Sequence, residues 1–305
     1  MIKTDFVRND RESEKNMETV SEKALAKLNL YLEITGRRAD GYHAIESVMQ
    51  TVTLADTLSF VRREEEGVEI RTGAPLPTDG ENLIVRAAQA FFAETGRPFG
   101  FCVLLEKKIP VAAGLGGGSA DAAATLRALN RLSGFPLSGE TLGRVAARVG
   151  ADVPFCLSGG TALCRGIGEE LTPLFPRLSP YAVVAKAGEG VSTPWAYAAV
   201  DCAPQEAAHR PDALLSALAS DNLHALAGAL YNRFEAVVLP ARPAVGELRE
   251  KLTRLGAKGV LMSGSGPSVF GLFGQEDYAR SAAAALTAQG VQAFAVSFAG
   301  RREEN

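Results

Sequence analysis

Alternating hydrophobic and polar residues near the start of the chain predict a strand. Apolar side chains stand there at every second position, at Leu28, Leu30, Leu32 and Ile34. Polar residues alternate with them, beginning with Lys27 and Asn29. A period of two is typical of a half-buried strand, so we expect Lys27 and Asn29 to share its polar face.

A turn and two further apolar segments follow this strand. The pair Asp40 and Gly41 is typical of a turn. Residues 47–54 and 57–61 are rich in apolar side chains. Together they predict an antiparallel layer beside the first strand.

Helical spacing begins after Asn82. Apolar residues recur at intervals that place them on one helical face, at Leu83, Ile84, Ala87, Ala88 and Phe91. Asn82 suits the N-cap of this helix, and Gly96 suits its end. Residues 101–107 then predict a strand.

Two more helices are expected between residues 120 and 150. The inner face of the first is marked by Ala122, Leu126 and Leu129, and that of the second by Leu142, Val145, Ala146 and Val149. Gly134 and Pro136 end the first helix, while Ser138 caps the second and Gly150 ends it. Strands and helices thus mix without the strict alternation of a doubly wound sheet, which favours an α+β fold.

The length of 305 residues favours two domains. Residues 171–180 contain three prolines and form the predicted boundary. We expect domains over residues 20–175 and 176–305, with a linker-like alanine-rich stretch near residues 203–213. Residues 1–19 are crowded with charges and predict a disordered extension.

The overall composition is that of an ordinary globular protein. Hydrophobic residues make up 47% and charged residues 22% of the chain, and the formal net charge is -3. This charge offers no basic field for nucleic acid or an anionic membrane, and no apolar run reaches the ~20 residues of a membrane span. The four cysteines lack the paired spacing of a metal site, and the start of the chain lacks the apolar segment of a signal peptide. We expect a cytoplasmic monomer or weak homodimer with a small-molecule partner.

A glycine-rich segment joins the strand at 101–107 to the next helix. Glycines let backbone N–H groups approach an anion, and the helix N-terminus adds unpaired donors and the positive end of its dipole. A flexible linker is the alternative, but linkers do not normally stand between a hydrophobic strand and a strong helix former. The predicted phosphate-binding residues are Pro110, Val111, Ala112, Ala113, Gly114, Leu115, Gly116, Gly117, Gly118, Ser119 and Ala120.

Two common phosphate-binding loops are excluded by the residues in this segment. A P-loop needs lysine followed by serine or threonine after its last glycine, and no lysine stands there. The dinucleotide pattern that starts at Gly114 needs glycine at position 119, where the chain has Ser119. The loop therefore belongs to another class.

Several ordered motifs resemble the superfamily of galactokinase, homoserine kinase, mevalonate kinase and phosphomevalonate kinase. They lie at residues 26–30 (Ala-Lys-Leu-Asn-Leu), 110–124, 150–155 (Gly-Ala-Asp-Val-Pro-Phe) and 263–268 (Ser-Gly-Ser-Gly-Pro-Ser). With residues 36–43 and 81–86, the chain resembles over residues 20–299 the branch of kinases that act on 4-diphosphocytidyl-2-C-methyl-D-erythritol.

The resemblance implies a two-domain kinase with an N-terminal ATP-binding domain and a C-terminal substrate-binding domain. It implies transfer of phosphate from ATP, with Mg²⁺, to the 2-hydroxyl of that cytidine-diphosphate substrate, in the non-mevalonate route to isoprenoid precursors. Lys27 and Asp152 match the catalytic pair of the family, in which the aspartate accepts the hydroxyl proton and the lysine orients it. Ser119 would help to hold the phosphates or Mg²⁺. Without the resemblance, Lys27 is the polar face of a strand and Asp152 a turn or cap residue.

The resemblance also implies a set of substrate-binding residues. Cytosine would stack between Tyr42 and Tyr197, with His43 bonded to the base edge. Asn29 and Thr193 would contact the substrate. Asn82 matches the family residue that reads adenine, and its role as a helix N-cap stands equally open.

Two alternatives remain. A kinase of the same superfamily that acts on homoserine or mevalonate is disfavoured by the segment Gly-Tyr-His at residues 41–43. A catalytically silent nucleotide sensor is disfavoured because both Lys27 and Asp152 are present.

Overall fold

The computed structural model describes residues 19–204 and 209–302. The extension predicted for residues 1–19 lies outside the described residues except for Thr19, which begins the first strand. The strands are β1 (Thr19–Arg37), β2 (His43–Arg63), β3 (Val68–Thr72), β4 (Gly100–Glu106), β5 (Thr161–Arg165), β6 (Glu170–Leu174), β7 (Tyr181–Lys186), β8 (Tyr231–Asn232), β9 (Val260–Met262), β10 (Ser268–Phe273) and β11 (Ala293–Ser297). The helices are α1 (Leu83–Thr95), α2 (Gly117–Leu132), α3 (Gly139–Val149), α4 (Val153–Ser158), α5 (Thr193–Cys202), α6 (Asp212–Leu218), α7 (Leu223–Gly228), α8 (Glu235–Ala241), α9 (Pro243–Arg254) and α10 (Glu276–Thr287).

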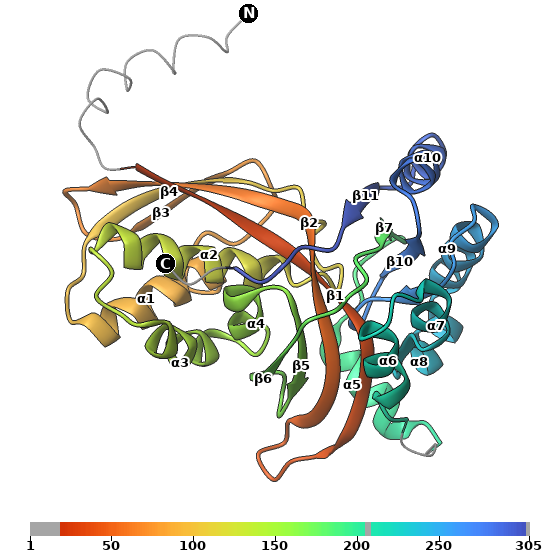
Figure 1. The fold of residues 1–305 in the computed structure, drawn as a ribbon. Coiled ribbons are helices and arrows are strands. Elements are labelled where there is room, and N and C mark those ends of the chain that lie inside the picture. Colours follow the sequence, from red (N-terminus) through yellow and green to blue (C-terminus); the bar gives the residue numbers. More distant parts are fainter. Residues whose placement is uncertain (1–18, 205–208, 303–305) are drawn as a thin grey trace, which may run out of the picture.

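A long antiparallel hairpin of β1 and β2 forms the spine of the molecule. It runs between the two halves of the protein, with α1 to α4 on one side and α5 to α10 on the other (Figure 1). The first sheet has the order β3-β4-β2-β1-β8. In addition, β5 pairs with β2, and β6 pairs with β5. The two predicted segments at 47–54 and 57–61 form the single strand β2, which continues through Ala55 and Asp56 without a turn.

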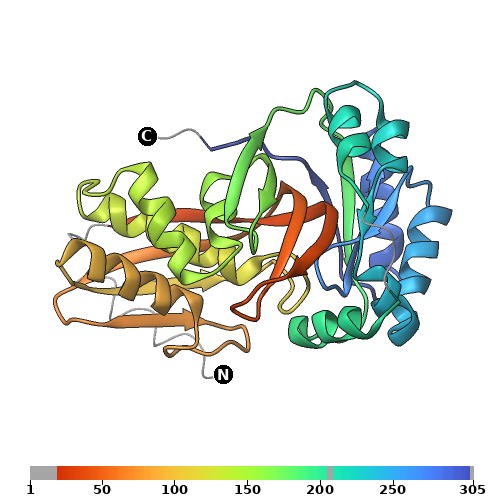
Figure 2. The same cartoon turned by 90° about the horizontal axis from the view of Figure 1, so that it is seen from below.

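The second sheet is antiparallel and has the order β11-β7-β10-β9. One of its faces packs on α9 and α10, in a core that includes Leu248, Leu252 and Leu286. Its other face meets the spine, where Val184 and Phe270 share a core with Leu30 of β1. Figure 2 shows this sheet standing beside the first half of the molecule, with helices outside it. The mixed architecture confirms the α+β class.

Both faces of β1 are covered by other parts of the protein, so its polar residues are buried as well. Lys27 is only 5% exposed and Asn29 is fully buried, so the expectation of a half-buried strand with a polar outer face is wrong. The reason is long-range. Leu28 and Leu30 enter the core shared with the second sheet, while the glycine-rich loop lies against Lys27.

Local signals at the helix ends are confirmed. The Asn82 side chain accepts a hydrogen bond from Ile84 N and caps α1, which ends at Gly96 with φ 65°. Ser138 caps α3 in the same way. Each cap satisfies a backbone N–H that the helix itself leaves without a partner.

The chain passes from the first sheet to the second between Leu174 and Tyr181. The last described residues return to the first half of the molecule, where Phe298 pairs with Val52 of β2 and Arg301 with Gly159, shortly before β5. The domain division at residues 175–176 stays a prediction. In the described part of the chain, no helix is long and apolar enough to span a membrane.

Candidate active site

The glycine-rich loop wraps around the start of α2. Gly114 and Gly116 have φ values of 74° and 68°, a region that favours glycine. A Cβ on Gly114 would lie 2.1 Å from the carbonyl oxygen of Ser263, so the loop is packed directly against the segment before β10. Lys27 N donates to Leu115 O at 3.0 Å and fixes the loop to β1. The loop is therefore a rigid cradle and not a flexible linker.

The cradle lines a cavity of about 350 Å³. Residues 110–119 contribute to it, together with Asn82, Lys107 and Asp121. Ala120, although predicted as a contact, points from the first turn of α2 into the core and does not line the cavity. The free N–H groups at the start of α2 make this cavity suited to phosphate.

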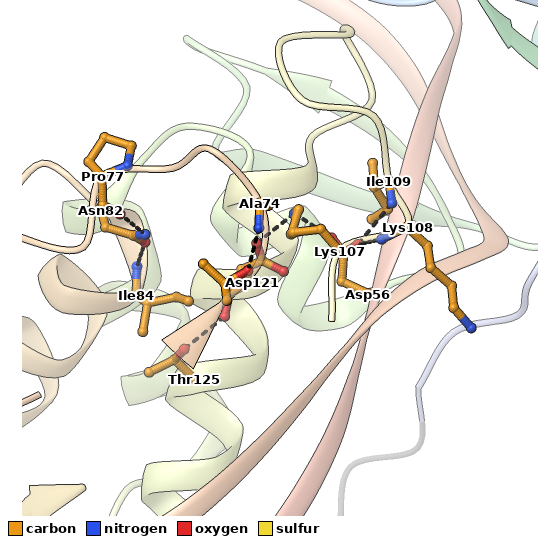
Figure 3. A network of polar contacts seen from close by, with 11 residues as sticks. Asp56, Ala74, Pro77, Asn82, Ile84, Lys107, Lys108, Ile109, Asp121 and Thr125 are labelled. Carbon is orange, nitrogen blue, oxygen red and sulfur yellow. Dashed lines mark hydrogen bonds and ion pairs between the residues drawn. The ribbon is translucent and has the colours of Figure 1, made fainter. Parts of the chain in front are cut away.

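Asn82 also lines this cavity, and Figure 3 shows its contacts with Pro77 and Ile84. Besides capping α1, its amide nitrogen donates to Pro77 O at 2.6 Å. Both ends of the side chain therefore have partners within the protein. The N-cap role is confirmed, while adenine recognition by Asn82 stays a prediction.

A buried charge network that sequence reasoning missed lies under the cradle. Lys107 Nζ lies 2.5 Å from Asp56 Oδ2 and 2.7 Å from Asp121 Oδ2 (Figure 3). Two carboxylates thus share one ammonium group, and Asp121 Oδ1 is buried without a hydrogen-bond partner in the described structure. Burial raises the pKa of Asp121 to about 7, and Asp56 adds to the rise while Lys107 opposes it.

This network predicts a pH effect on stability in the nucleotide-free protein. Because the pKa of Asp121 lies at about 7 in the folded chain and 3.8 is its ordinary value, the folded state retains a proton that the unfolded state has lost. Stability should therefore fall as pH rises between these two values. Asp121→Asn should remove this fall, and urea unfolding at about pH 5 and about pH 8 measures it.

An exposed carboxylate supplies the control for this measurement. Asp277→Asn, in the first turn of α10, should keep the wild-type pH dependence. If Asp121→Asn also loses stability between the two pH values as the wild type does, Asp121 is not the titrating group.

Lys27 and Asp152 meet at 3.5 Å between Nζ and Oδ2. Lys27 also donates to Asn29 Oδ1 at 2.6 Å, which confirms that these two residues share a face. Asp152 stands at the N-cap position of α4, but its side chain makes no capping hydrogen bond. Its carboxylate is therefore available for another role.

A larger cavity of about 730 Å³ contains this pair. Gly114, Gly116 and Ser119 line it and the cradle cavity alike, so the two spaces meet at the start of α2. Lys27 and Asp152 lie on the side of the larger cavity. A group held in the cradle can thus face a molecule held in the larger cavity.

All the predicted substrate residues line this larger cavity: Asn29, Tyr42, His43, Thr193 and Tyr197. The rings of His43 and Tyr197 stack at 4.5 Å, and His43 Nε2 lies 2.8 Å from Asp201 Oδ1. Tyr42 is 63% exposed at the rim. In this arrangement it is His43 that covers Tyr197, so the stacking of cytosine between Tyr42 and Tyr197 stays a prediction.

Further contacts in the site join distant segments. Thr193 Oγ1 lies 3.0 Å from Ser265 Oγ, and Ser263 Oγ donates to Gly114 O at 3.0 Å. The motif at residues 263–268 was the only sequence signal for these contacts. Asp201 and Asp56 belong to no motif and could not have been found before folding.

The chain matches two protein families and several proteins of known function. Residues 82–160 match the family GHMP kinases N terminal domain, and residues 214–292 match GHMP kinases C terminal. A 4-diphosphocytidyl-2-C-methyl-D-erythritol kinase from Gloeobacter violaceus is 44% identical over 91% of this chain and 94% of its own length. One from Exiguobacterium sibiricum is 45% identical over 86% of this chain and 92% of its own.

Solved structures agree with the sequence relatives. A crystal structure of 4-(cytidine 5'-diphospho)-2C-methyl-D-erythritol kinase is similar at 38% identity with a TM-score of 0.77, and the match covers 92% of this chain and 100% of that one. Homoserine kinase from Cytophaga hutchinsonii, at 22% identity and a TM-score of 0.69, covers 93% of this chain and 96% of its own. The second likeness shows the fold alone.

Proposed function

The chain belongs to the 4-diphosphocytidyl-2-C-methyl-D-erythritol kinase family of the GHMP kinases, and from this premise we propose that it phosphorylates the 2-hydroxyl of 4-diphosphocytidyl-2-C-methyl-D-erythritol with ATP. It is a small-molecule kinase of the isoprenoid precursor pathway. One observation supports the assignment most strongly. The pair of Lys27 and Asp152 lines the larger cavity, which meets the cradle cavity at the start of α2.

Asp152 and Lys27 have different roles in the transfer of the γ-phosphoryl group. The substrate oxygen forms a bond to the γ-phosphorus as the bond from that phosphorus to the ADP oxygen breaks. Asp152 accepts the hydroxyl proton, and Lys27 holds Asp152 and offsets charge on the transferred group. The N–H groups of the cradle would bind the β- and γ-phosphates and so present the γ-phosphate to the larger cavity.

Mg²⁺ fits the residues at the start of α2. Ser119 lines both cavities, and the buried Asp121 Oδ1 beside the cradle has no hydrogen-bond partner in the described structure. Ser119, supported by Asp121, would hold the ion, which neutralises charge on the phosphates. Among the described residues, no group of three or more His, Cys, Asp and Glu forms a separate metal site.

The larger cavity accounts for substrate selection. His43 and Tyr197 offer an aromatic stack with a polar edge, and Tyr42 closes its rim. Asn29 and Thr193 complete the wall. We assign the cytidine-diphosphate portion to this space. The proposal includes a cytoplasmic monomer or weak homodimer without nucleic acid or membrane partners.

The deciding experiment mixes purified protein with ATP, Mg²⁺ and 4-diphosphocytidyl-2-C-methyl-D-erythritol. ADP release and a product heavier by one phosphoryl group, seen by mass spectrometry, are expected. Homoserine and mevalonate serve as matched controls and should give no product. Turnover on either control with none on the cytidine-diphosphate substrate would replace the proposed substrate.

A further inference from the structure

A chain of buried hydrogen bonds leads from Lys27 into the protein. Lys27 Nζ donates to Asn29 Oδ1 at 2.6 Å, and Asn29 Nδ2 donates to Ser47 Oγ at 2.8 Å. Ser47 Oγ in turn donates to the backbone carbonyl oxygen of Tyr31 at 2.7 Å. Asn29 and Ser47 are fully buried, so water does not compete for these bonds. We name these three bonds the hydrogen-bond chain.

The direction of each bond in the hydrogen-bond chain is fixed by its chemistry. A backbone carbonyl oxygen can only accept, and a lysine ammonium can only donate. The hydroxyl of Ser47 has one proton, which goes to the Tyr31 carbonyl, so its oxygen accepts from the Asn29 amide nitrogen. The Asn29 amide oxygen therefore faces Lys27. If the amide were turned over, its NH₂ group would meet the ammonium, and two donors would face each other.

The Asn29 amide holds the Lys27 ammonium more closely than Asp152 does. The distance from Nζ to Asp152 Oδ2 is 3.5 Å, which is longer than an ordinary hydrogen bond. The stem of Lys27 runs against the cradle, because a Cβ on Gly116 would lie 2.9 Å from Lys27 Cγ. The ammonium is thus placed beside Asp152 by other groups, and the carboxylate keeps its lone pairs for a substrate hydroxyl.

The pairing of β1 with β2 brings Ser47 beneath the site. Leu32 of β1 lies opposite Ser47 of β2, and the register of the two strands shifts between Asn29 and Tyr31. Such a shift changes the direction of nearby side chains. Ser47 lines neither the cradle cavity nor the larger cavity. It can therefore act on the site only through the residues that it holds.

We propose that Ser47 is a positioning residue of the kinase site, which acts through Asn29 to hold the Lys27 ammonium beside Asp152. This inference rests on the proposed function, because it needs Lys27 to act in phosphoryl transfer. Without the hydroxyl of Ser47, the Asn29 amide loses the acceptor that fixes its orientation, and its NH₂ group can turn toward Lys27. The ammonium then leaves its place, and a displacement of about 1 Å can cost about 100-fold in rate.

A matched pair of variants separates positioning from a simple loss of stability. Ser47→Ala removes the hydroxyl from the hydrogen-bond chain. Thr161→Val on β5, the strand that pairs with β2, removes another buried hydroxyl, which donates to Gln50 Oε1. Both changes should lower the stability, since each leaves a buried polar group without its partner. Thr161 lines neither cavity of the kinase site, so its replacement should leave catalysis unchanged.

Initial rates with ATP and the cytidine-diphosphate substrate test the proposal. The kcat of Ser47→Ala should fall by about 10- to 100-fold while KM for both substrates stays within about threefold, because Lys27 acts in the transition state. Ser47→Thr, which keeps the hydroxyl, should recover kcat to within about threefold of the wild type. Thr161→Val should keep the wild-type kcat. Urea unfolding shows that the proteins compared are folded and measures the stability that each variant loses.

Crystal structures of the wild type and both variants, grown under the same conditions, give a readout that does not depend on turnover. Lys27 Nζ should move by about 1 Å or more in Ser47→Ala and keep its place in Thr161→Val.

Three results would each overturn the proposal. They are near-normal kcat in folded Ser47→Ala, an equal loss of kcat in Thr161→Val, and an unmoved Lys27 ammonium in Ser47→Ala. No turnover of the cytidine-diphosphate substrate by the wild type would instead contradict the proposed function, and the position of Lys27 would still decide the role of Ser47.

Discussion

Replacing Asp152 by asparagine is expected to lower kcat by about 10²- to 10⁴-fold, the range for loss of a general base. The amide cannot accept the hydroxyl proton, yet it keeps the size of the carboxylate. Because Asp152 makes no capping hydrogen bond and lies on the side of the larger cavity, the fold and the cradle should be unaffected. Initial rates with the cytidine-diphosphate substrate, with ADP binding measured by calorimetry, give the two quantities separately.

The control for this variant is Asp277→Asn on α10, which lies outside both cavities and should turn over normally. ADP affinity of the Asp152→Asn protein should stay within about threefold of the wild type, which corresponds to a change of less than about 1 kcal/mol in binding free energy. A folded variant with near-normal kcat would exclude Asp152 as the proton acceptor.

Replacing Gly114 by alanine is expected to disable the cradle. The φ of 74° costs alanine about 1 kcal/mol or more, and its Cβ would lie 2.1 Å from the carbonyl oxygen of Ser263. That oxygen belongs to the backbone, so the loop or the segment before β10 must move. We expect a loss of about 2–5 kcal/mol in the free energy of unfolding, from backbone strain together with overpacking. ADP affinity should fall with it, because the N–H groups leave their positions.

Gly143→Ala on α3 is the matched control. A Cβ there meets nothing within 4 Å, and the backbone is helical. This change should stabilise the chain by up to about 1 kcal/mol. Urea unfolding and calorimetric titration with ADP measure both variants. If Gly114→Ala matches the control in stability and in ADP affinity, the close approach to Ser263 does not shape the cradle.

Much of the local structure could be predicted because its causes lie within a few residues. The Asn82 cap of α1 and the Ser138 cap of α3 depend on a side chain and a backbone N–H two or three positions away. The shared face of Lys27 and Asn29 follows from the period of a strand. The conformation of the glycine-rich segment is also a local property, because the positive φ values at positions 114 and 116 favour glycine there.

Burial could not be predicted in the same way. Lys27 was expected on an outer polar face, yet it is buried beneath the glycine-rich loop. The alternation of side chains says which residues share a face but not what will cover that face. Here the second sheet covers one side of β1, and the loop closes the other.

The sequence by itself determined the helix caps, the strand period, the cradle and, through its ordered motifs, the kinase family. Only the tertiary structure decided that Lys27 and Asp152 stand 3.5 Å apart and that Lys107 bridges Asp56 and Asp121. The physical reason is the range of the interactions. The hydrogen bonds of helix caps and the conformation of the backbone act over a few residues, whereas apolar burial is non-directional and brings distant charged groups together only as the whole chain packs.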